Sequence, residues 1–338
     1  MSPSILMFGG APTEQGGSDV FFSAIPRRNC RRSITMPDLP GGWCMLLRPR
    51  ISAGRAGGAI VDEDKAGSLA CVGVGMMLGA HLTPRARSTI EQADVVFVLV
   101  ADALMEEWVR RIHPDVRSLQ PFYREGTSRM RSYRGMVEAM LAEVRAGKRV
   151  CGAFYGHPGV FAWVPHRAIA QARAAGHAGW MEPGISAEDC LYADLGVDPG
   201  TAGCQHYEAT RFMLYRRRID PAAWLVLWQV GVAGDRTLAR PITGEAYRRV
   251  LVDLLEADYP PEHEVILYRA ATLPTQAPLI RRMPLSWLPH AAVDPLDTLV
   301  VPPAETLLPD PLVVRRLAAL AASPNPSGGT TCGETLNE

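Results

Sequence analysis

The residues best suited to chemistry are two phenols and a guanidinium close together in the sequence, at Tyr123, Arg129 and Tyr133. On a helix, Arg129 and Tyr133 would share a face, because residues four apart are neighbours on the helix surface. A guanidinium beside a phenol favours the phenolate and lowers the phenol pKa from its usual value of about 10. The pattern therefore predicts a proton acceptor, and its alternative is a polar surface patch with no catalytic role.

Glycines follow the first buried apolar stretch, in the run Val72-Gly73-Val74-Gly75. Glycine lets the backbone come close to a ligand because no side chain stands in the way. The signal is weak alone, since Leu78 occupies the last position of a full Gly-x-Gly-x-x-Gly pattern. A tight turn between strand and loop, with no ligand, explains the glycines equally well.

A second glycine-rich loop, Tyr155-Gly156-His157-Pro158-Gly159-Val160-Phe161, directly follows a predicted buried strand. Open α/β sheets bind ligands at the carboxyl ends of their strands, so this loop is a candidate binding loop. His157 is a possible base, but a histidine between glycine and proline is more typical of a local hydrogen-bonding residue.

A third segment, Pro183-Gly184-Ile185-Ser186, precedes a predicted helix that begins Ala187-Glu188-Asp189-Cys190. Ser186 is suited to cap that helix, and Glu188 and Asp189 would lie at the positive end of its dipole. Capping and contact with a ligand are compatible here. Cys190 as a nucleophile is less favoured than a buried structural thiol, because no base stands beside it in the sequence.

The apolar pattern around these segments predicts an α/β protein. In the first part, strands are expected over 69–73, 94–100 and 149–154, and helices over 84–92, 102–112, 130–146 and 166–175. Strands that alternate with helices predict a doubly wound parallel sheet. After residue 184, longer strands over 224–230 and 264–268 flank a helix over 244–258 and predict a second α/β domain.

The 338-residue chain is 47 % apolar, and its 35 lysines and arginines balance 35 aspartates and glutamates. It is large enough for two packed domains, and no overall charge favours nucleic acid, a membrane surface or an acidic partner. The seven cysteines are widely spaced and form no Cys-x-x-Cys pair, which argues against a disulfide framework and a zinc site. No apolar run approaches the roughly 18 residues that span a bilayer, and no signal peptide is recognisable. We expect a cytoplasmic protein with reduced thiols and no metal.

Residues 1–66 differ from the rest, since glycine, proline, serine and arginine recur and no apolar period persists. We expect this segment to be a disordered extension or the result of a mis-assigned start codon. The folded part is expected to comprise an N-terminal α/β domain over 68–183 and a C-terminal α/β domain over 184–304. Residues 305–338 are expected to form a short helix and a disordered tail.

Together these segments resemble the tetrapyrrole (corrin/porphyrin) methylases, with a glycine turn after the first strand, a Gly-x-Pro loop after the third, and Pro-Gly-x-Ser before a helix. More specifically, the runs over 154–161 and 183–195 resemble the borosin, or omphalotin-type, peptide backbone N-methyltransferases. The resemblance continues through Asp198-Pro199, Tyr207-Glu208-Ala209 and the run over 225–231, and it covers roughly residues 68–320.

This resemblance implies the tetrapyrrole-methylase fold, in which two α/β domains hold S-adenosyl-L-methionine in the cleft between them. It also implies a homodimer, a peptide substrate made by the ribosome and then modified, and no metal. The family's catalytic tyrosines and arginine correspond to Tyr123, Arg129 and Tyr133. The residues that would line the cofactor site are Gly73, Gly75, Tyr155, His157, Pro158, Val160, Phe161, Ser186, Ala187 and Gln229.

The chemistry suits these residue types. A peptide nitrogen is a poor nucleophile because its lone pair is delocalised into the carbonyl, so methylation requires proton removal and stabilisation of charge on the oxygen. Tyr133 or Tyr123 as phenolate is the expected base, and Arg129 is expected to lower its pKa and to bind the developing imidate. Alignment of the reactants in the cleft would supply much of the acceleration.

Two departures from the borosin pattern affect the expected substrate. Gln120 stands where a further catalytic tyrosine is found in those enzymes. Residues 323–338 contain no apolar stretch that resembles a fused substrate peptide, so we expect a split enzyme that methylates a separate precursor peptide.

Two other functions remain open at this point. One is methylation of a carbon atom of a corrin or porphyrin, although the Gly-Asp-Pro loop of such enzymes reads Gly156-His157-Pro158 here. The other is a catalytically inactive scaffold that binds a peptide or the cofactor.

Overall fold

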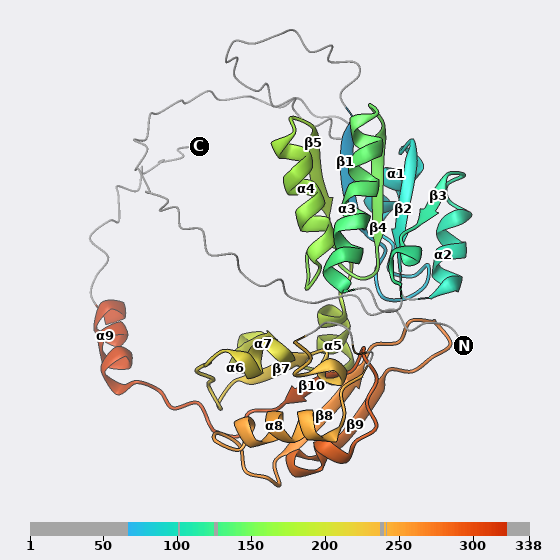
Figure 1. The fold of residues 1–338 in the computed structure, drawn as a ribbon. Helices are drawn as coiled ribbons and strands as arrows, with labels where there is room; N and C mark the ends of the chain where they lie inside the picture. The colour runs from blue at the N-terminus through green and yellow to red at the C-terminus, as the bar shows by residue number, and fades with distance from the viewer. Residues whose placement is uncertain (1–66, 101, 125–127, 237–239, 241, 323–338) are drawn as a thin grey trace, which may run out of the picture.

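The computed structural model describes residues 67–100, 102–124, 128–236, 240 and 242–322. The extension expected over 1–66 and the tail expected after residue 322 lie outside the described residues. The described chain folds into two α/β domains that lie side by side (Figure 1). The predicted α/β class with two sheets is confirmed.

The N-terminal domain is built on a wholly parallel sheet with the strand order β3-β2-β4-β1-β5. Its strands are β1 (Ser68–Gly73), β2 (Val95–Leu99), β3 (Val116–Ser118), β4 (Arg149–Phe154) and β5 (Ala178–Glu182). Its helices are α1 (Pro84–Glu91), α2 (Ala103–Arg110), α3 (Arg129–Arg145) and α4 (Trp163–Ala174). The central strands are almost fully buried, as expected for a parallel sheet with both faces covered.

The C-terminal domain has a mixed sheet with the strand order β6-β7-β10-β8-β9, in which β6 and β7 are parallel and the other neighbours antiparallel. Its strands are β6 (Cys204–Glu208), β7 (Trp224–Trp228), β8 (Glu264–Arg269), β9 (Leu279–Pro284) and β10 (Thr298–Val301). Its helices are α5 (Ala187–Leu195), α6 (Pro199–Ala202), α7 (Ala209–Leu214) and α8 (Glu245–Leu255).

Two elements end or begin elsewhere than the sequence predicts. The strand expected to reach residue 230 ends at Trp228, because Gln229 takes the left-handed backbone conformation with φ of 62°. The helix expected from residue 166 begins at Trp163 and carries Pro165 in its first turn. Proline is tolerated there because the first N–H groups of a helix have no helical partner.

The loops that follow β1, β4 and β5 meet through glycine backbone. A Cβ added to Gly73 would lie 2.3 Å from the Gly156 carbonyl oxygen and 2.7 Å from the Gly184 Cα, closer than real Cβ atoms approach. Gly75 and Gly156 exchange backbone hydrogen bonds of 3.2 and 2.9 Å, and both have positive φ. The glycines after β1 therefore allow three loops to pack together at the carboxyl edge of the sheet.

The two faces of the second sheet pack against different partners. Val226 and Trp228 belong to the core that also holds the N-terminal domain and Leu191 of α5. Leu225 and Leu227 point the other way, into a core shared with α7 and α8. The alternation follows from the period of two along a strand. One continuous apolar core therefore joins the two domains.

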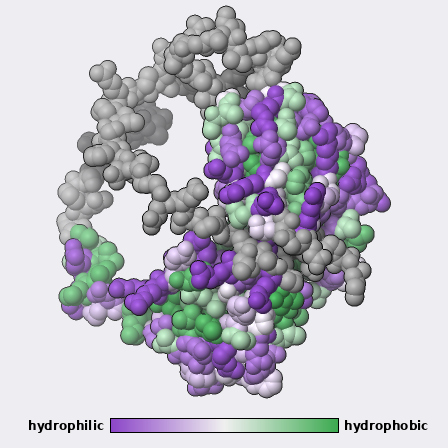
Figure 2. Space-filling view, in the orientation of Figure 1, coloured by the Kyte–Doolittle hydropathy of each residue, from purple (hydrophilic) through white to green (hydrophobic). Residues whose placement is uncertain are grey.

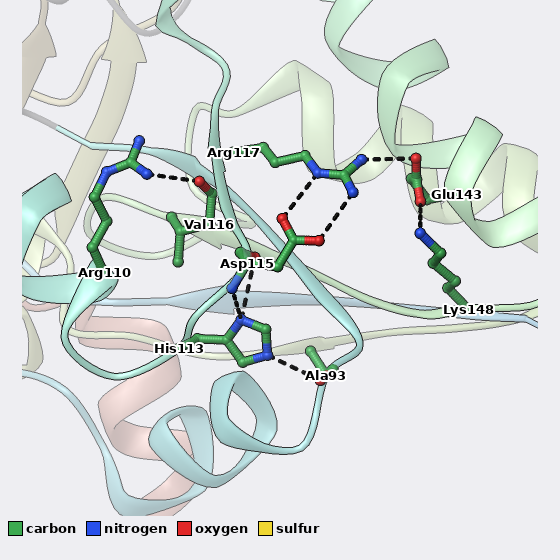
Figure 3. A network of polar contacts seen from close by, with 8 residues as sticks. All are labelled: Ala93, Arg110, His113, Asp115, Val116, Arg117, Glu143 and Lys148. Carbon is green, nitrogen blue, oxygen red and sulfur yellow. Dashed lines mark hydrogen bonds and ion pairs between the residues drawn. The ribbon is translucent and has the colours of Figure 1, made fainter.

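A network of charged groups fixes the edge strand β3 to α3 (Figure 3). Arg117 donates two hydrogen bonds of 3.0 Å to Asp115 and one of 2.8 Å to Glu143 of α3. Glu143 also pairs with Lys148, and these two cations lower the pKa of the Glu143 carboxyl group. Asp115 precedes the first residue of β3, so the network lies at the amino end of the sheet, away from the glycine contact.

Helix α9 (Pro311–Ala322) stands apart from both domains and buries none of its residues (Figure 1). Its side chains Leu312, Leu317 and Leu320 are 65 %, 60 % and 70 % exposed, and the helix appears as a largely green surface in Figure 2. Exposed apolar side chains gathered on one element are typical of interaction surfaces. Within the described part of the chain, no helix has both the length and the apolar character needed to cross a membrane.

The glycine contact predicts that Gly73→Ser will destabilise the protein. The new side chain must displace backbone atoms of Gly156 and Gly184, which costs about 2–3 kcal/mol of unfolding free energy when a packed core is overfilled. Urea denaturation followed by circular dichroism measures the change. Gly244→Ser is the matched control, because a Cβ at Gly244 meets nothing within 4 Å and serine is a preferred N-cap for α8. Equal stability of the two variants would contradict the prediction.

Candidate active site

A cavity opens between the domains, at the carboxyl ends of strands from both sheets. It encloses about 570 Å³, part of it open to solvent. The loop after β4, the first turn of α5 and the end of β7 form most of its wall, which is where α/β sheets commonly bind ligands. The residues that line it are Met76, Tyr155, Gly156, His157, Val160, Phe161, Ser186, Ala187, Glu188, Trp228, Gln229, Leu296 and Thr298.

Two residues on this wall have an uncommon backbone conformation. Phe161 and Gln229, with φ of 49° and 62°, are the non-glycine residues with positive φ in the described chain. Such conformations cost about 1–3 kcal/mol each and persist only where the surrounding structure fixes them. Their concentration at one cavity supports its assignment as a functional site.

The loop after β4 is held in shape by its own polar groups. His157 Nδ1 accepts a hydrogen bond of 2.8 Å from the Gly159 N–H, and His166 Nε2 donates one of 2.9 Å to the Gly159 carbonyl. The local hydrogen-bonding role expected of His157 is therefore confirmed. Tyr155 also lines the cavity, and burial raises the pKa of its phenol, which therefore stays protonated.

Ser186 caps α5, as predicted. The Ser186 hydroxyl accepts a hydrogen bond of 3.3 Å from the Asp189 N–H, and the Asp189 carboxylate accepts one of 2.7 Å from the Ser186 N–H. This reciprocal capping box orients the first turn of α5 toward the cavity. Burial, with Asp194 nearby, raises the pKa of the Cys190 thiol to about 11, which agrees with a structural thiol and not with a nucleophile.

A chain of hydrogen bonds leads from the cavity wall into the C-terminal domain. Trp228 Nε1 donates to His206 Nδ1 at 3.2 Å, and the two rings stack with centroids 5.9 Å apart. His206 Nε2 lies 2.8 Å from the Tyr192 hydroxyl. That hydroxyl donates to Glu188 Oε1 at 3.0 Å. Trp228 and Glu188, at the two ends of the chain, both line the cavity.

The hydrogen-bond donors in this series determine which ring nitrogen of His206 carries the proton. An indole N–H can only donate, so the Nδ1 of His206 accepts and carries no proton. The ring proton is then on Nε2, which donates to Tyr192 and leaves the tyrosine proton for Glu188. Burial lowers the pKa of His206, although Glu188 opposes the effect, and this agrees with a neutral ring. The Glu188 carboxylate is thereby oriented at the cavity wall.

The cluster of phenols and guanidinium is buried where the two domains meet. Arg129 and Tyr133 lie in the first turns of α3 and are 7 % and 3 % exposed. The Tyr123 ring meets Tyr133 edge-on at 6.2 Å between centroids, and Tyr133 stacks on Trp163 at 6.1 Å. Arg129 donates a hydrogen bond of 2.9 Å to the Arg240 carbonyl of the C-terminal domain. Arg129 and Tyr133 are therefore not part of an exposed polar patch, whereas Arg124 and Arg131 in the same segment are exposed.

The expected lowering of a phenol pKa is also wrong for Tyr123. Burial raises the Tyr123 pKa, Tyr133 adds to the effect, and Arg129 opposes it only in part. A side-chain hydrogen bond with Tyr133 also raises the Tyr123 pKa, and the Tyr123 hydroxyl is buried. Tyr123 is therefore a protonated phenol that can donate a hydrogen bond to a bound group.

The Gln120 side chain forms a hydrogen bond with the backbone next to this cluster. It opens a short 3₁₀ turn over Gln120–Phe122, and its Nε2 donates a hydrogen bond of 3.1 Å to the Val100 carbonyl just beyond β2. The side chain that replaces a tyrosine of the borosin pattern thus holds the end of a strand.

Most of the residues predicted to line the cofactor site do line the cavity, namely Tyr155, His157, Val160, Phe161, Ser186, Ala187 and Gln229. Gly73, Gly75 and Pro158 do not line it, since Gly73 and Gly75 form the backbone contact behind it and Pro158 is buried in the loop. The lining residues that were not predicted are Met76, Gly156, Glu188, Trp228, Leu296 and Thr298. Tyr133 instead borders a smaller hollow, which Leu99, Phe154 and Trp163 also line.

Two cysteines of the described chain lie in the core of the first sheet. Cys71 and Cys151 are buried in β1 and β4, and burial raises the pKa of both thiols. In the described part of the chain, no group of three or more His, Cys, Asp or Glu side chains is arranged to hold a metal ion.

Comparison with known proteins gives a consistent group of relatives. The family profile described as tetrapyrrole (corrin/porphyrin) methylases matches residues 68–288. A methyltransferase/ribosomally synthesized type I borosin cyclic peptide precursor of Coprinopsis marcescibilis is 45 % identical over 228 residues, 67 % of this chain and 58 % of the relative. The methyltransferase/ribosomally synthesized cyclic peptide omphalotin A precursor of Omphalotus olearius is 40 % identical over 270 residues, 78 % of this chain and 64 % of the relative. The chain thus spans about three fifths of the length of these relatives.

Solved structures agree on the fold. Uroporphyrin-III-C-methyltransferase from Thermus thermophilus is 23 % identical, has a TM-score of 0.51, and is matched over 73 % of this chain and 99 % of its own. At this level of identity the likeness concerns the fold alone. The predicted tetrapyrrole-methylase fold is confirmed.

The neutral state of His206 predicts a pH-dependent stability. Folded His206 binds a proton less readily than unfolded His206, so its contribution to the unfolding free energy is lost as the pH falls below about 6.5. In His206→Asn this titration is absent while the asparagine oxygen can still accept from Trp228. Urea denaturation between about pH 8 and pH 5.5 should give a steeper loss of stability for wild type than for the variant. Parallel losses would contradict the neutral state assigned to His206.

Proposed function

Because the chain belongs to the tetrapyrrole (corrin/porphyrin) methylases, a family of methyltransferases, we propose that it transfers methyl groups from S-adenosyl-L-methionine to backbone amides of a peptide. The observation that carries this proposal is the position of the buried Tyr123, Arg129 and Tyr133 cluster beside the interdomain cavity. Phe161 lines the cavity, and Trp163, two residues further along the chain, stacks on Tyr133. A cofactor in the cavity and a substrate at the tyrosines would therefore be close neighbours.

The cavity residues fit S-adenosyl-L-methionine. Met76, Val160 and Leu296 supply an apolar wall for an adenine ring, as ligand sites of this size commonly do. The aromatic rings of Phe161 and Trp228 suit a positively charged sulfonium. Glu188, whose carboxylate is oriented by Tyr192, would accept hydrogen bonds from ribose hydroxyls or an ammonium group. When bound, the cofactor supplies an electrophilic methyl group.

A peptide substrate is supported by the relatives and by the tyrosine cluster. The relatives at 40 % and 45 % identity are named as methyltransferases and cyclic peptide precursors. The cluster brings together buried groups that can take a proton and stabilise negative charge, and an amide requires both. The tetrapyrrole alternative is supported by the fold alone, since the uroporphyrin enzyme is 23 % identical.

We assign three roles within the cluster. Tyr133 accepts the proton of the amide nitrogen, and Arg129, on the same face of α3, offsets part of the cost that burial imposes on a phenolate there. Tyr123, kept protonated by burial, donates a hydrogen bond to the amide oxygen as negative charge develops there. Arg129 stabilises the same charge. Burial of all three groups excludes water and strengthens these electrostatic effects.

We further propose that the precursor peptide is a separate molecule and that the reaction takes place in the cytoplasm. The named relatives combine methyltransferase and peptide precursor in one chain, so the opposite arrangement is the direct competitor. Mass analysis after incubation with the cofactor distinguishes them, because methyl groups appear either on the protein itself or on an added peptide.

The protein is also proposed to act as a homodimer. Helix α9 exposes Leu312, Leu317 and Leu320 and contacts neither domain of its own chain, and a second copy would cover this apolar surface. A C2 dimer would bury both copies of the helix at once.

Tyr133→Phe tests the catalytic assignment. Loss of the proton acceptor should slow peptide methylation by at least about 100-fold, the usual contribution of a positioned general base. Calorimetric titration should give an S-adenosylhomocysteine affinity within about threefold of wild type, because Tyr133 does not line the cavity. The readout is mass spectrometry of the protein and of peptides encoded by neighbouring genes after incubation with the cofactor.

Tyr259→Phe is the matched control for that experiment. Tyr259 is a buried phenol of the C-terminal core whose hydroxyl has no hydrogen-bond partner among the described residues. It should methylate like wild type. Equal rates in Tyr133→Phe and Tyr259→Phe would refute the role of Tyr133, and failure of wild type to bind the nucleoside would refute the cofactor assignment.

Leu317→Glu tests the dimer. A charge on the exposed apolar face of α9 should convert the wild-type dimer to a monomer, because burial of an unpaired carboxylate is unfavourable. Light scattering coupled to size-exclusion chromatography measures the mass. Leu104→Glu on α2 is the control, since Leu104 is 59 % exposed against 60 % for Leu317. A monomeric wild type, or a dimeric Leu317→Glu, would count against the proposal.

A further inference from the structure

A second hollow lies directly beside the cavity, open to solvent and enclosing about 950 Å³. Trp163 and His166 of α4 form one side of it, and Tyr207, Arg211 and Arg217 of the C-terminal domain form the other. We call it the arginine groove. Neither the cofactor nor the tyrosine cluster occupies it in the assignment above.

The arginine groove leads to both halves of the proposed active site. Phe161 lines the groove and also the cavity, where its ring lies 5.7 Å from that of Trp228. Trp163 lines the groove and stacks on Tyr133. A chain lying in the groove would therefore approach the methyl donor along Phe161 and the proton acceptor along Trp163.

The outer end of the groove carries positive charge that the described protein does not neutralise. The Arg217 guanidinium lies over the Tyr207 ring at 5.1 Å and near that of Tyr215 at 6.0 Å. Arg216, Arg217 and Arg218 are exposed, and no carboxylate of the described chain lies within ion-pair distance of them. The Tyr207 and Tyr215 rings hold the planar Arg217 guanidinium in place without an ion pair.

One carboxylate, that of Glu208, also lines the groove, and it is hydrogen-bonded to the start of α7. Glu208 caps α7, and its two oxygens accept hydrogen bonds from the Thr210 N–H at 3.1 Å and the Arg211 N–H at 2.7 Å. These two hydrogen bonds hold the Glu208 carboxylate against the positive end of α7. The groove combines an aromatic floor with an available guanidinium at its rim.

We propose that the arginine groove binds an acidic segment of the peptide substrate, and this inference rests on the peptide methylation proposed above. A carboxylate of the segment pairs with Arg217, which offers the planar fork that suits carboxylates. Apolar side chains of the same segment lie against Trp163 and Tyr207. The acidic residue thereby fixes which amide of the peptide reaches Tyr133.

A peptide fits this groove better than a nucleic acid does. A polyanion is held by a track of cations along its whole length and by a basic overall field. Here the exposed Arg217 stands on one side of the groove, and the chain carries 35 basic against 35 acidic residues. A few carboxylates beside apolar residues match that arrangement.

Fluorescence anisotropy with labelled peptides tests the groove in the full-length protein with S-adenosylhomocysteine present. One probe carries a cluster of glutamates beside a run of valine, isoleucine and glycine, and a second probe has glutamines in their place. Wild type should bind the glutamate probe about tenfold more tightly at low salt, and salt should reduce the preference. Arg217→Gln should reduce the preference to about twofold or less and leave the glutamine probe unaffected.

Two further variants test whether the charge preference depends on Arg217 itself. Arg87→Gln removes an exposed arginine on α1, far from the groove, and should keep the full preference. Arg217→Glu should prefer a probe with lysines in place of the glutamates, which a mere loss of folding could not produce. A single-stranded oligonucleotide that binds wild type more tightly than the glutamate probe, and loses that affinity in Arg217→Gln, would overturn the proposal in favour of nucleic acid.

Equal binding of glutamate and glutamine probes by wild type would also overturn it. Calorimetric titration of the same preparation separates this failure from that of the proposed function. If S-adenosylhomocysteine binds and peptides are methylated without any charge preference, only the groove assignment fails. If wild type neither binds the nucleoside nor methylates a peptide, the proposed function itself fails.

Discussion

The backbone contact between Gly73, Gly156 and Gly184 is the constraint on which the rest of the site depends. β4, β1 and β5 are neighbours in a parallel sheet, so the loops that leave them emerge side by side at one edge. The contact leaves no space for a Cβ, and it therefore fixes the loop after β4 against the segment that leads into α5. Nearly half of the residues that line the cavity follow these two glycines, so the contact positions much of the cavity wall.

The C-terminal domain completes the site through aromatic contacts rather than backbone packing. Trp228 lies between Phe161 of the first domain and His206 of β6, with ring centroids 5.7 and 5.9 Å away. After Trp228 the chain turns through the left-handed Gln229, and the Val230 N–H bonds the Asp297 carbonyl at 3.0 Å. That turn ends β7 at the cavity wall. Phe161 and Gln229, which have positive φ, thus line the cavity from the first and the second domain respectively.

The sequence was sufficient for the parts of the fold that follow local rules. The capping of α5 by Ser186 depends on residues three positions apart, and the parallel strands of the first domain are continuous apolar runs. Trp228 and Glu188 could not be assigned to the cavity, because a strand tryptophan and a first-turn glutamate fit structural roles equally well. The left-handed backbone conformation of Gln229 also could not be predicted from the neighbouring sequence, because the tertiary structure imposes it. The Tyr123 pKa was predicted with the wrong sign because spacing reveals a nearby arginine but not burial.

The raised pKa of Tyr123 has a chemical consequence. Burial outweighs Arg129 at Tyr123, so the cluster combines a phenol that keeps its proton with a second phenol one helical turn from a guanidinium. The proposed reaction requires this asymmetry, because one group must take a proton from nitrogen while another donates a hydrogen bond to oxygen. Arg129 is also tied to the Arg240 carbonyl of the opposite domain. The guanidinium of the proposed catalytic cluster is therefore positioned by a contact with the C-terminal domain, so the proposed cluster depends on both domains.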